Sequence, residues 1–208
     1  MRVVFSNTLR IRTLGLAVAQ RPGGYLLACS HVSHLDPFCL GAVLPRKIGW
    51  MARIEFYRRR WAVRLLRAVH AFPVNRQGVP VRAIKTALVR LACGEVVGVF
   101  PEGEIKTGSA SVLRGGPIKR GVCLLAARSG CPVLPCVILG TDKLNAVGPW
   151  LPFLRGRLWI ACGPFIEPVR GPDRRAARAE MAAQIERALT ELYAQLRREC
   201  GLDDSVLP

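Results

Sequence analysis

Short apolar runs alternate with longer amphipathic segments along this chain of 208 residues. Runs rich in Val, Ile and Leu predict strands, and apolar residues three or four positions apart predict helices. The predicted strands are residues 10–18, 25–29, 47–52, 70–74, 95–100, 133–139 and 157–162. The predicted helices are residues 37–44, 54–68, 79–93, 117–129 and 174–199. This alternation predicts an α/β fold with a central, mostly parallel or mixed β-sheet flanked by helices.

The whole chain, residues 1–208, is expected to form a single domain. It contains no internal repeat, no low-complexity tract and no linker that would divide it. We expect the core at about residues 10–170. The last predicted helix, at about residues 174–199, has an apolar stripe at helical spacing, so it is expected to pack along one face. The stripe consists of Ile185, Leu189, Leu192 and Leu196.

The charge of the chain is strongly basic. There are 31 Lys and Arg residues against 14 Asp and Glu, a formal net charge of +17. Such a field attracts nucleic acid, an anionic membrane or a phosphorylated small molecule, and charge alone does not choose among them. No Cys/His finger or RNA-recognition signature occurs, and the basic residues interleave with the predicted strands. No nucleic acid is therefore expected as a partner.

The eight cysteines contain no Cys-x-x-Cys pair, and most lie in apolar runs. This distribution indicates reduced thiols in a cytosolic protein rather than a disulfide framework or a zinc site. No uncharged apolar stretch approaches the ~18 residues of a membrane-spanning helix, and the apolar run near the N-terminus is too short for a secretion signal. We expect the protein to stay inside the cell.

The predicted helix at residues 54–68 combines five arginines with aromatic residues. That composition is typical of a helix that lies on an anionic membrane surface. In the alternative interpretation, its apolar residues face the core and its arginines are only solvated.

Polar residues follow several of the predicted strands directly. The segments are SHVSHLD after residues 25–29, NRQG after 70–74, PEGEIKTG after 95–100 and GTDK after 133–139. Because ligands bind beyond the carboxyl ends of strands in open α/β sheets, these segments predict the functional site of an enzyme.

The first of these segments places His31 five residues before Asp36. Asp36 and Pro37 are suited to open a helix, with Asp36 as its N-cap. A carboxylate on one ring nitrogen sets the tautomer of a histidine, so the other nitrogen can take a proton from a substrate hydroxyl. The pair therefore predicts a general base that acts on the hydroxyl of a substrate.

Three other interpretations of this segment remain open from the residues alone. Asp36 can simply cap a helix while His31 is an ordinary turn residue. His31, His34 and Asp36 faintly resemble a metal cluster, although the only other histidine is His70. Ser30 or Ser33 can act as a nucleophile, although no Gly-x-Ser-x-Gly turn surrounds either serine.

Four blocks in a fixed order carry a resemblance to a known family. The His-x4-Asp block at residues 31–36 is followed by HAFPVNR (70–76), VFPEGEIKTG (99–108) and GPIKRGVCLLAARSGCPVLPCVILGT (116–141). Together they resemble the glycerolipid acyltransferase family, which includes the lysophosphatidic acid acyltransferases, over most of the chain. The resemblance implies a single α/β domain like that of glycerol-3-phosphate acyltransferases.

The resemblance also implies a reaction. An O-acyltransferase would move a fatty acyl group from acyl-CoA or acyl carrier protein to the hydroxyl of a lysophospholipid. The acceptor most directly implied is 1-acylglycerol-3-phosphate, which would give phosphatidic acid in phospholipid biosynthesis. Another lysolipid or amphiphilic alcohol is the alternative acceptor, and a non-catalytic basic protein that binds lipid or nucleic acid is the alternative class.

Site residues follow from the matched blocks. His31 would be the general base and Asp36 its partner, and Arg76 would hold the phosphate of the acceptor. Glu102 and Gly103 would contribute to substrate binding, Gly103 by permitting close approach of the backbone. The second block departs from the family because His70 stands where a glycine is usual.

The third block also departs from the usual Glu-Gly-Thr-Arg-Ser. After Gly103 this chain has Glu104, Ile105 and Lys106, so the family's second phosphate-binding arginine is missing. Lys106, Arg114 and Lys119 are the candidate replacements. This departure leaves the identity of the acceptor open.

The resemblance implies no metal site and no cofactor beyond the acyl-CoA or acyl carrier protein that serves as co-substrate. The implied partners are this acyl donor, a lysophospholipid acceptor and an anionic membrane surface. The expected location is the cytoplasmic face of the membrane, with peripheral attachment.

Overall fold

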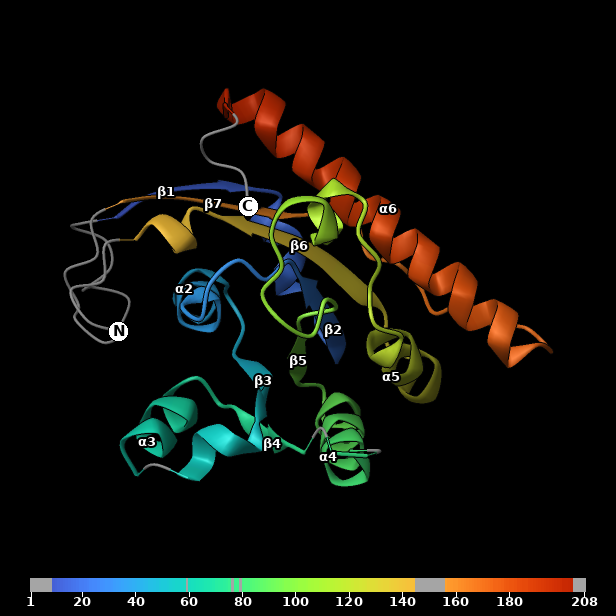
Figure 1. Cartoon of the computed structure of the whole chain (residues 1–208). Helices are drawn as coiled ribbons and strands as arrows, with labels where there is room; N and C mark the ends of the chain where they lie inside the picture. The colour runs from blue at the N-terminus through green and yellow to red at the C-terminus, as the bar shows by residue number, and fades with distance from the viewer. Residues whose placement is uncertain (1–8, 59, 76, 79, 145–155, 204–208) are drawn as a thin grey trace.

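The computed structural model describes residues 9–58, 60–75, 77–78, 80–144 and 156–203 (Figure 1). Within these residues, seven strands form one sheet. They are β1 (Leu9–Leu14), β2 (Tyr25–Cys29), β3 (Ile48–Arg53), β4 (Phe72–Val74), β5 (Val96–Val99), β6 (Val133–Leu139) and β7 (Gly156–Cys162). Their order across the sheet is β1-β7-β6-β2-β5-β3-β4. The predicted α/β fold with a mostly parallel sheet is confirmed.

One pairing in the sheet is antiparallel. β6 and β7 run in opposite directions, whereas every other neighbouring pair is parallel. As a consequence, β7 and β1 begin at the edge of the sheet where β2, β5 and β6 end. Side chains early in β7 and β1 therefore lie at the same edge as the loops that follow β2, β5 and β6.

Helices cover both faces of the sheet (Figure 1). The α-helices of the described residues are α2 (Asp36–Val43), α3 (Arg60–Ala68), α4 (Val81–Ala92), α5 (Gly121–Ser129) and α6 (Arg174–Cys200). The short 3-10 turns are η1 (Leu16–Gln20), η2 (Ile54–Arg58), η3 (Gly108–Ala110), η4 (Val112–Arg114) and η5 (Thr141–Lys143). One apolar cluster joins a sheet face to α4, α5 and α6, and a second joins the other face to α2 and η1. Alternate side chains of each strand feed the two clusters, as period-2 geometry requires.

The last helix confirms the predicted apolar stripe. Ile185, Leu189, Leu192 and Leu196 are all buried in the cluster on the α4–α6 face. Asp173 caps the helix by accepting hydrogen bonds from the backbone N–H groups of Arg175 and Ala176.

Three predicted boundaries are wrong. The strand predicted at residues 10–18 ends at Leu14, because Gly15 adopts φ +65 and turns the chain into η1. The helix predicted at residues 54–68 is divided into η2 and α3, since the chain must turn directly after β3 to bring β4 back alongside it. The helix predicted at residues 117–129 starts at Gly121, because residues 117–120 belong to the loop that leads from the third block.

All eight cysteines are free thiols, and five of them are buried. Burial raises the pKa of the Cys39 thiol to about 12 and that of the Cys123 thiol to about 11. These buried thiols pack as small apolar groups, as the sequence predicted. In the described part of the chain, no three His, Cys, Asp or Glu residues are grouped so as to hold a metal ion.

None of the helices in the described residues is both long enough and apolar enough to span a bilayer.

Candidate active site

The loop between β2 and α2 brings His31 and Asp36 into contact. The Nδ1 atom of His31 lies 2.8 Å from Oδ2 of Asp36. A carboxylate oxygen accepts hydrogen bonds, so Nδ1 carries the proton and Nε2 is left as an acceptor. The His31 side chain is 13% exposed, whereas that of Asp36 is completely buried. The pair is therefore arranged as a base that faces outward and a carboxylate that orients it from inside.

Asp36 is held by its own network. Oδ2 also accepts hydrogen bonds from the backbone N–H groups of Val32 and Ser33, at 2.9 and 3.0 Å. Oδ1 accepts a short hydrogen bond from the hydroxyl of Thr141, in η5 after β6. The expectation that Asp36 is the N-cap of the helix is wrong. Leu35 occupies the N-cap position, because the Asp36 carboxylate turns back onto the loop that carries His31.

Thr141 was not identified from the sequence. It lies in the GTDK segment that follows β6, and its position after a strand was the only signal available. Its contact with Asp36 bridges 105 positions in the chain, so only the folded sheet brings the two side chains together.

A stack of aromatic rings fixes the plane of the His31 imidazole. The ring of His31 lies on that of Phe100, with centroids 3.9 Å apart and an interplanar angle of 18°. Phe100 in turn stacks on Trp50, at 4.8 Å and 11°. Trp50 faces Gly98 across β3 and β5, and a Cβ at Gly98 would come within 2.5 Å of the indole ring. The absence of a side chain at Gly98 thus makes room for the ring on which this stack is built.

Glu102 is buried beneath the same loop, with only 1% of its surface exposed. Its Oε2 atom accepts a hydrogen bond from the backbone N–H of His31 at 3.0 Å. Its Oε1 atom accepts one from the backbone N–H of Val112 in η4 at 2.9 Å. The carboxylate therefore ties the His31 loop to the loop of the third block. The sequence suggested a substrate contact for Glu102, whereas both of its oxygens are directed at the backbone.

Gly103 and Lys119 are neighbours in the long segment between β5 and α5. Gly103 adopts φ +74, and a Cβ there would meet Nζ of Lys119 at 2.8 Å, so the lysine side chain lies across the glycine. The N–H of Gly103 donates to the carbonyl of Phe100 at 2.9 Å. The ammonium group of Lys119 lies 3.9 Å from Oε1 of Glu104, and both side chains are about three-fifths exposed. The group that lies closest to the open side of Gly103 in the structure is the Lys119 side chain.

The remaining predicted phosphate ligands are less closely placed. Lys106 follows Gly103 by three residues on the same loop and is partly buried. Arg76 lies outside the described residues. His31, Asp36, Glu102, Gly103 and Lys119 are thus brought to the edge where β2 and β5 end.

His70 shows how the departure in the second block is accommodated. It adopts φ +52, the only positive φ among the described residues other than glycine. The left-handed conformation favours glycine, and His is among the residues that tolerate it best. The usual glycine therefore marks a backbone requirement that His70 still meets, and its carbonyl accepts a hydrogen bond from Arg90.

The geometry also decides between the interpretations left open above. Ser30 is fully buried, and its hydroxyl exchanges hydrogen bonds with the backbone of Ile138, so it joins β2 to β6 and cannot reach a substrate. The Ser33 hydroxyl accepts from the N–H of Leu35. The ring of His34 lies 6.4 Å from that of His31 between centroids and meets it edge-on. The arrangement favours a histidine base over a serine nucleophile or a metal site.

Comparison with known proteins identifies the family. A family model described as Acyltransferase matches residues 10–139. The chain belongs to the acyltransferase family. A relative with 29% identity over 179 residues is the 1-acyl-sn-glycerol-3-phosphate acyltransferase of Bacillus subtilis, and the match covers 85% of this chain and 82% of that protein. The resemblance predicted from the four blocks is confirmed, and the protein is an acyltransferase.

A solved structure shares the fold. The 1-acyl-sn-glycerophosphate acyltransferase PlsC from Thermotoga maritima superposes with a TM-score of 0.64 at 21% identity. The match covers 88% of this chain and 72% of the Thermotoga chain. The acyltransferase described here thus has the fold that its sequence resemblance implied.

Proposed function

We propose that this acyltransferase moves a fatty acyl group from an acyl thioester to the hydroxyl of a lysophospholipid. The acceptor that we favour is 1-acylglycerol-3-phosphate, which gives phosphatidic acid in phospholipid synthesis. The observation that carries the proposal is the buried Asp36 carboxylate on Nδ1 of His31, which leaves Nε2 as the acceptor for a proton. The name of the Bacillus relative supports this choice of acceptor.

The reaction balances with the groups of this site. Nε2 of His31 takes the proton of the acceptor hydroxyl as its oxygen attacks the thioester carbonyl carbon. The carbon–sulfur bond then breaks, and the proton on Nε2 passes to the departing thiolate, which leaves as a thiol. Asp36 stabilises the imidazolium that forms between these steps. We propose that no metal or redox cofactor takes part, because neither electrons nor a Lewis acid are needed to complete this sequence.

For the acceptor phosphate we propose Lys119 and Lys106, together with Arg76. Lys119 lies over Gly103 with its ammonium group near the exposed Glu104 carboxylate. A phosphate monoester carries about −1.5 to −2 charges near neutral pH, so it competes well with a single solvated carboxylate. Binding of the acceptor would then draw Lys119 away from Glu104 and towards the phosphate.

The test is release of free thiol from palmitoyl-CoA by the purified protein. We expect release that depends on lysophosphatidic acid, and palmitoylated acyl carrier protein offered in place of palmitoyl-CoA identifies the donor. Release with other lysolipids or amphiphilic alcohols alone would overturn the proposed acceptor. No release with any acceptor and either donor would overturn the proposed reaction.

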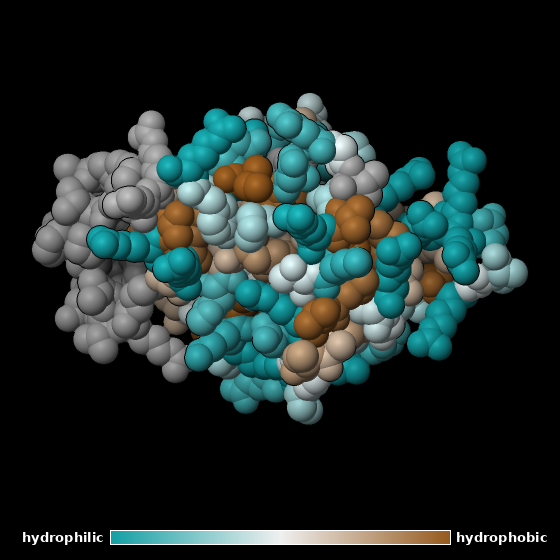
Figure 2. Space-filling model, turned by 90° about the horizontal axis from the view of Figure 1, so that it is seen from below, coloured by the Kyte–Doolittle hydropathy of each residue, from teal (hydrophilic) through white to brown (hydrophobic). Residues whose placement is uncertain are grey.

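A mixed apolar and basic surface supports the proposed attachment to the cytoplasmic face of a membrane. Four exposed large apolar side chains lie on η2 and α4, which face the viewer in Figure 2. They are Ile54, Phe56, Val81 and Val89. Exposed arginines surround η2 and α3, including Arg58, Arg64 and Arg67. Exposed apolar residues among cations are typical of surfaces that bind anionic lipid.

Sedimentation with phosphatidylglycerol vesicles tests this attachment. We expect the protein to sediment with the vesicles at low salt and to be released at high salt, because screening weakens attraction by exposed charges. At low salt, Phe56→Ser should reduce sedimentation relative to wild type, because it removes an exposed apolar side chain from this surface. Binding that is indifferent to salt, or equal on purely zwitterionic vesicles, would contradict an electrostatic attachment.

A further inference from the structure

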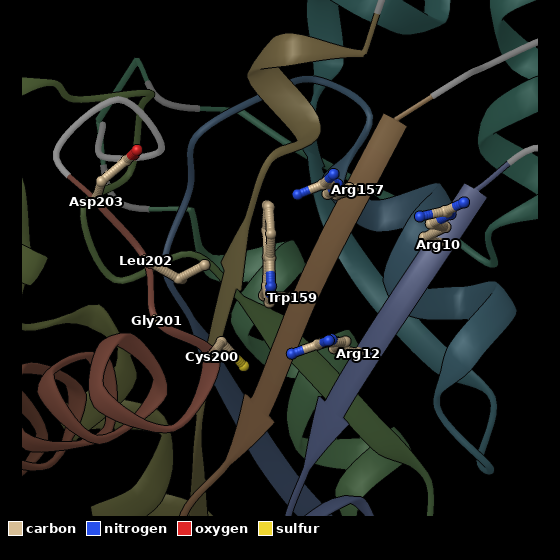
Figure 3. Close-up of a pocket in the computed structure, with 8 residues that line it drawn as sticks. All are labelled: Arg10, Arg12, Arg157, Trp159, Cys200, Gly201, Leu202 and Asp203. Carbon is tan, nitrogen blue, oxygen red and sulfur yellow. The ribbon is translucent and has the colours of Figure 1, made fainter.

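A second basic site lies at the far end of the sheet from α3 and α4. It is a cavity of about 360 Å³ between β1, β7 and the turn that follows α6 (Figure 3). Arg10 and Arg12 of β1 line it together with Arg157 and Trp159 of β7. The last residue of α6, Cys200, and the three residues that follow it form the other wall. Neither the proposed reaction nor the proposed membrane surface uses this cavity.

The strand register explains how three arginines come together. Arg10 pairs with Arg157 across the parallel strands β1 and β7, and Arg12 pairs with Trp159. Alternate residues of a strand share one face, so all four side chains stand on the same face of the sheet. Trp159 belongs to the apolar cluster under α6, which identifies this face as the one that α6 covers. α6 ends at Cys200, and the arginines line the space next to that end.

Charge in the cavity is unbalanced. None of the three guanidinium groups has an ion pair or side-chain hydrogen bond with another described residue. Asp203 is the one carboxylate among the described residues that line the cavity. Like charges directly opposite one another on neighbouring strands are destabilising, and a guanidinium group does not lose its proton in proteins. Arg10, Arg12 and Arg157 are exposed, so water screens part of this repulsion, and an anion bound between Arg10 and Arg157 would remove the rest.

Protection of a sheet edge does not explain the whole arrangement. β1 is an edge strand, and charged residues on edge strands discourage pairing with other chains. However, β7 lies between β1 and β6 in the sheet, and Arg157 pairs with β1 but lies two positions before the β6 ladder begins at Trp159, so protection of the edge strand accounts for the arginines of β1 alone. Arg157 nevertheless stands directly opposite Arg10.

The cavity and the His31–Asp36 pair lie on opposite faces of the sheet. The His31 ring stacks on Phe100, whose apolar contacts belong to the α2 face, whereas the arginines share the α6 face. Both sites lie towards the same edge of the sheet, because β7 runs antiparallel to β6. Cys162 at the end of β7 is level with Cys29 at the end of β2, so Arg157 lies five positions, about 17 Å, farther along the strands. β7 and β2 are also two positions apart in the sheet, a separation of about 10 Å. Only a long ligand with two separate functional groups can therefore reach both sites.

We propose that the cavity lined by Arg10, Arg12 and Arg157 is a phosphate-binding site distinct from the site of the acceptor phosphate. Guanidinium groups bind phosphate oxygens through paired hydrogen bonds, and Arg10 and Arg157 stand at paired positions of neighbouring strands, so both can contribute to binding one phosphate. The phosphate comes either from the nucleotide end of an acyl-CoA or from the headgroup of an anionic lipid. The proposal goes beyond the acyl transfer, and it is tested by binding in the absence of turnover.

The test compares the full-length protein with two double variants. Arg10→Gln/Arg157→Gln removes the facing pair, and Arg175→Gln/Arg187→Gln removes the same charge from exposed positions on α6. Each protein is titrated calorimetrically with adenosine 3′,5′-bisphosphate, which represents the nucleotide end of CoA. Each is also tested for sedimentation with vesicles that contain phosphatidic acid in a zwitterionic lipid.

We expect the first variant to bind at least one probe about tenfold more weakly than wild type, because a charged hydrogen-bonding partner is lost. The second variant should bind like wild type. If the first variant binds the nucleotide more weakly than wild type, the site is assigned to the acyl donor. If only its binding to the vesicles is weaker, the site is assigned to a lipid headgroup.

Equal binding by all three proteins, or binding of neither probe, would overturn the proposal. Thermal unfolding without ligand serves as the folding control. The Arg10→Gln/Arg157→Gln variant should unfold no earlier than wild type, because the substitution relieves the like-charge repulsion. Loss of acyl transfer in the test of the proposed function would leave these binding results unaffected.

Discussion

Replacing His31 with alanine is expected to lower kcat by about 10²–10⁴-fold and to leave the fold intact. Among the described residues of this site, His31 is the one group placed to take the proton of an acceptor hydroxyl, and the substitution removes it. Asp36 keeps its hydrogen bonds from Val32, Ser33 and Thr141, so its buried carboxylate is not left unpaired. Thiol release at saturating acceptor measures kcat, and circular dichroism with thermal unfolding checks the fold.

His34→Ala is the matched control for this substitution. His34 lies on the same loop, but its ring is exposed and has no hydrogen bond with Asp36 among the described residues. We expect the His34→Ala protein to keep the wild-type kcat. A rate near wild type for His31→Ala, or an equal loss for His34→Ala, would contradict the assignment of His31 as the base.

Glu102→Gln is expected to destabilise the protein by about 2–3 kcal/mol and to lower kcat by up to about 10²-fold. Each oxygen of Glu102 accepts from a different backbone N–H, that of His31 and that of Val112. The amide of glutamine can accept at only one end, so its NH2 group faces a buried donor whose direction is fixed. The loop that carries His31 then shifts away from its productive position.

The kinetic constants distinguish this positioning role from substrate binding. A positioning residue predicts a fall in kcat with little change in KM, together with a lower unfolding temperature. A substrate contact, as the third block suggested, predicts a higher KM and unchanged stability. The second result would return Glu102 to the substrate-binding residues.

Asp36→Asn provides a matched comparison, because it is the same exchange of carboxylate for amide at another buried site. Here the neighbour is the hydroxyl of Thr141, which can reverse and accept from the new NH2 group. The amide oxygen can keep the contacts with His31, Val32 and Ser33. We therefore expect a smaller loss of stability than for Glu102→Gln. A larger loss for Asp36→Asn would contradict the hydrogen-bond directions on which both predictions depend.

Local patterns were sufficient for the elements of the sheet. All seven predicted strands are present, because short apolar runs of β-branched residues are buried on both faces of a parallel sheet. The predicted ends of elements were less accurate where the chain packs against a segment far away in the sequence. Gly15 ends β1 early because its turn lies against β7, where a Cβ would fall 2.2 Å from the carbonyl oxygen of Cys162. No pattern within residues 10–18 indicates that contact.

In the candidate site, too, local contacts could be predicted from the sequence and contacts between distant segments could not. His31 and Asp36 could be paired from the sequence because five residues of loop are enough to return one side chain to the other. The roles of Thr141, Trp50 and Glu102 could not be predicted in this way. Each acts through a contact with a residue far away in the chain, and such contacts depend on strand order and register.

The sequence by itself determined the α/β class and the acyltransferase family, and it predicted the contact between His31 and Asp36. These depend on the local spacing of residues and on motif order, which the chain carries directly. Only the tertiary structure decided that Glu102 faces the backbone and that Asp36 holds a loop instead of capping a helix. It also placed Arg10 opposite Arg157. The reason is that the pairing of β2 with β5 and β6, and of β1 with β7, sets which residues of distant strands meet, and no local pattern encodes that choice.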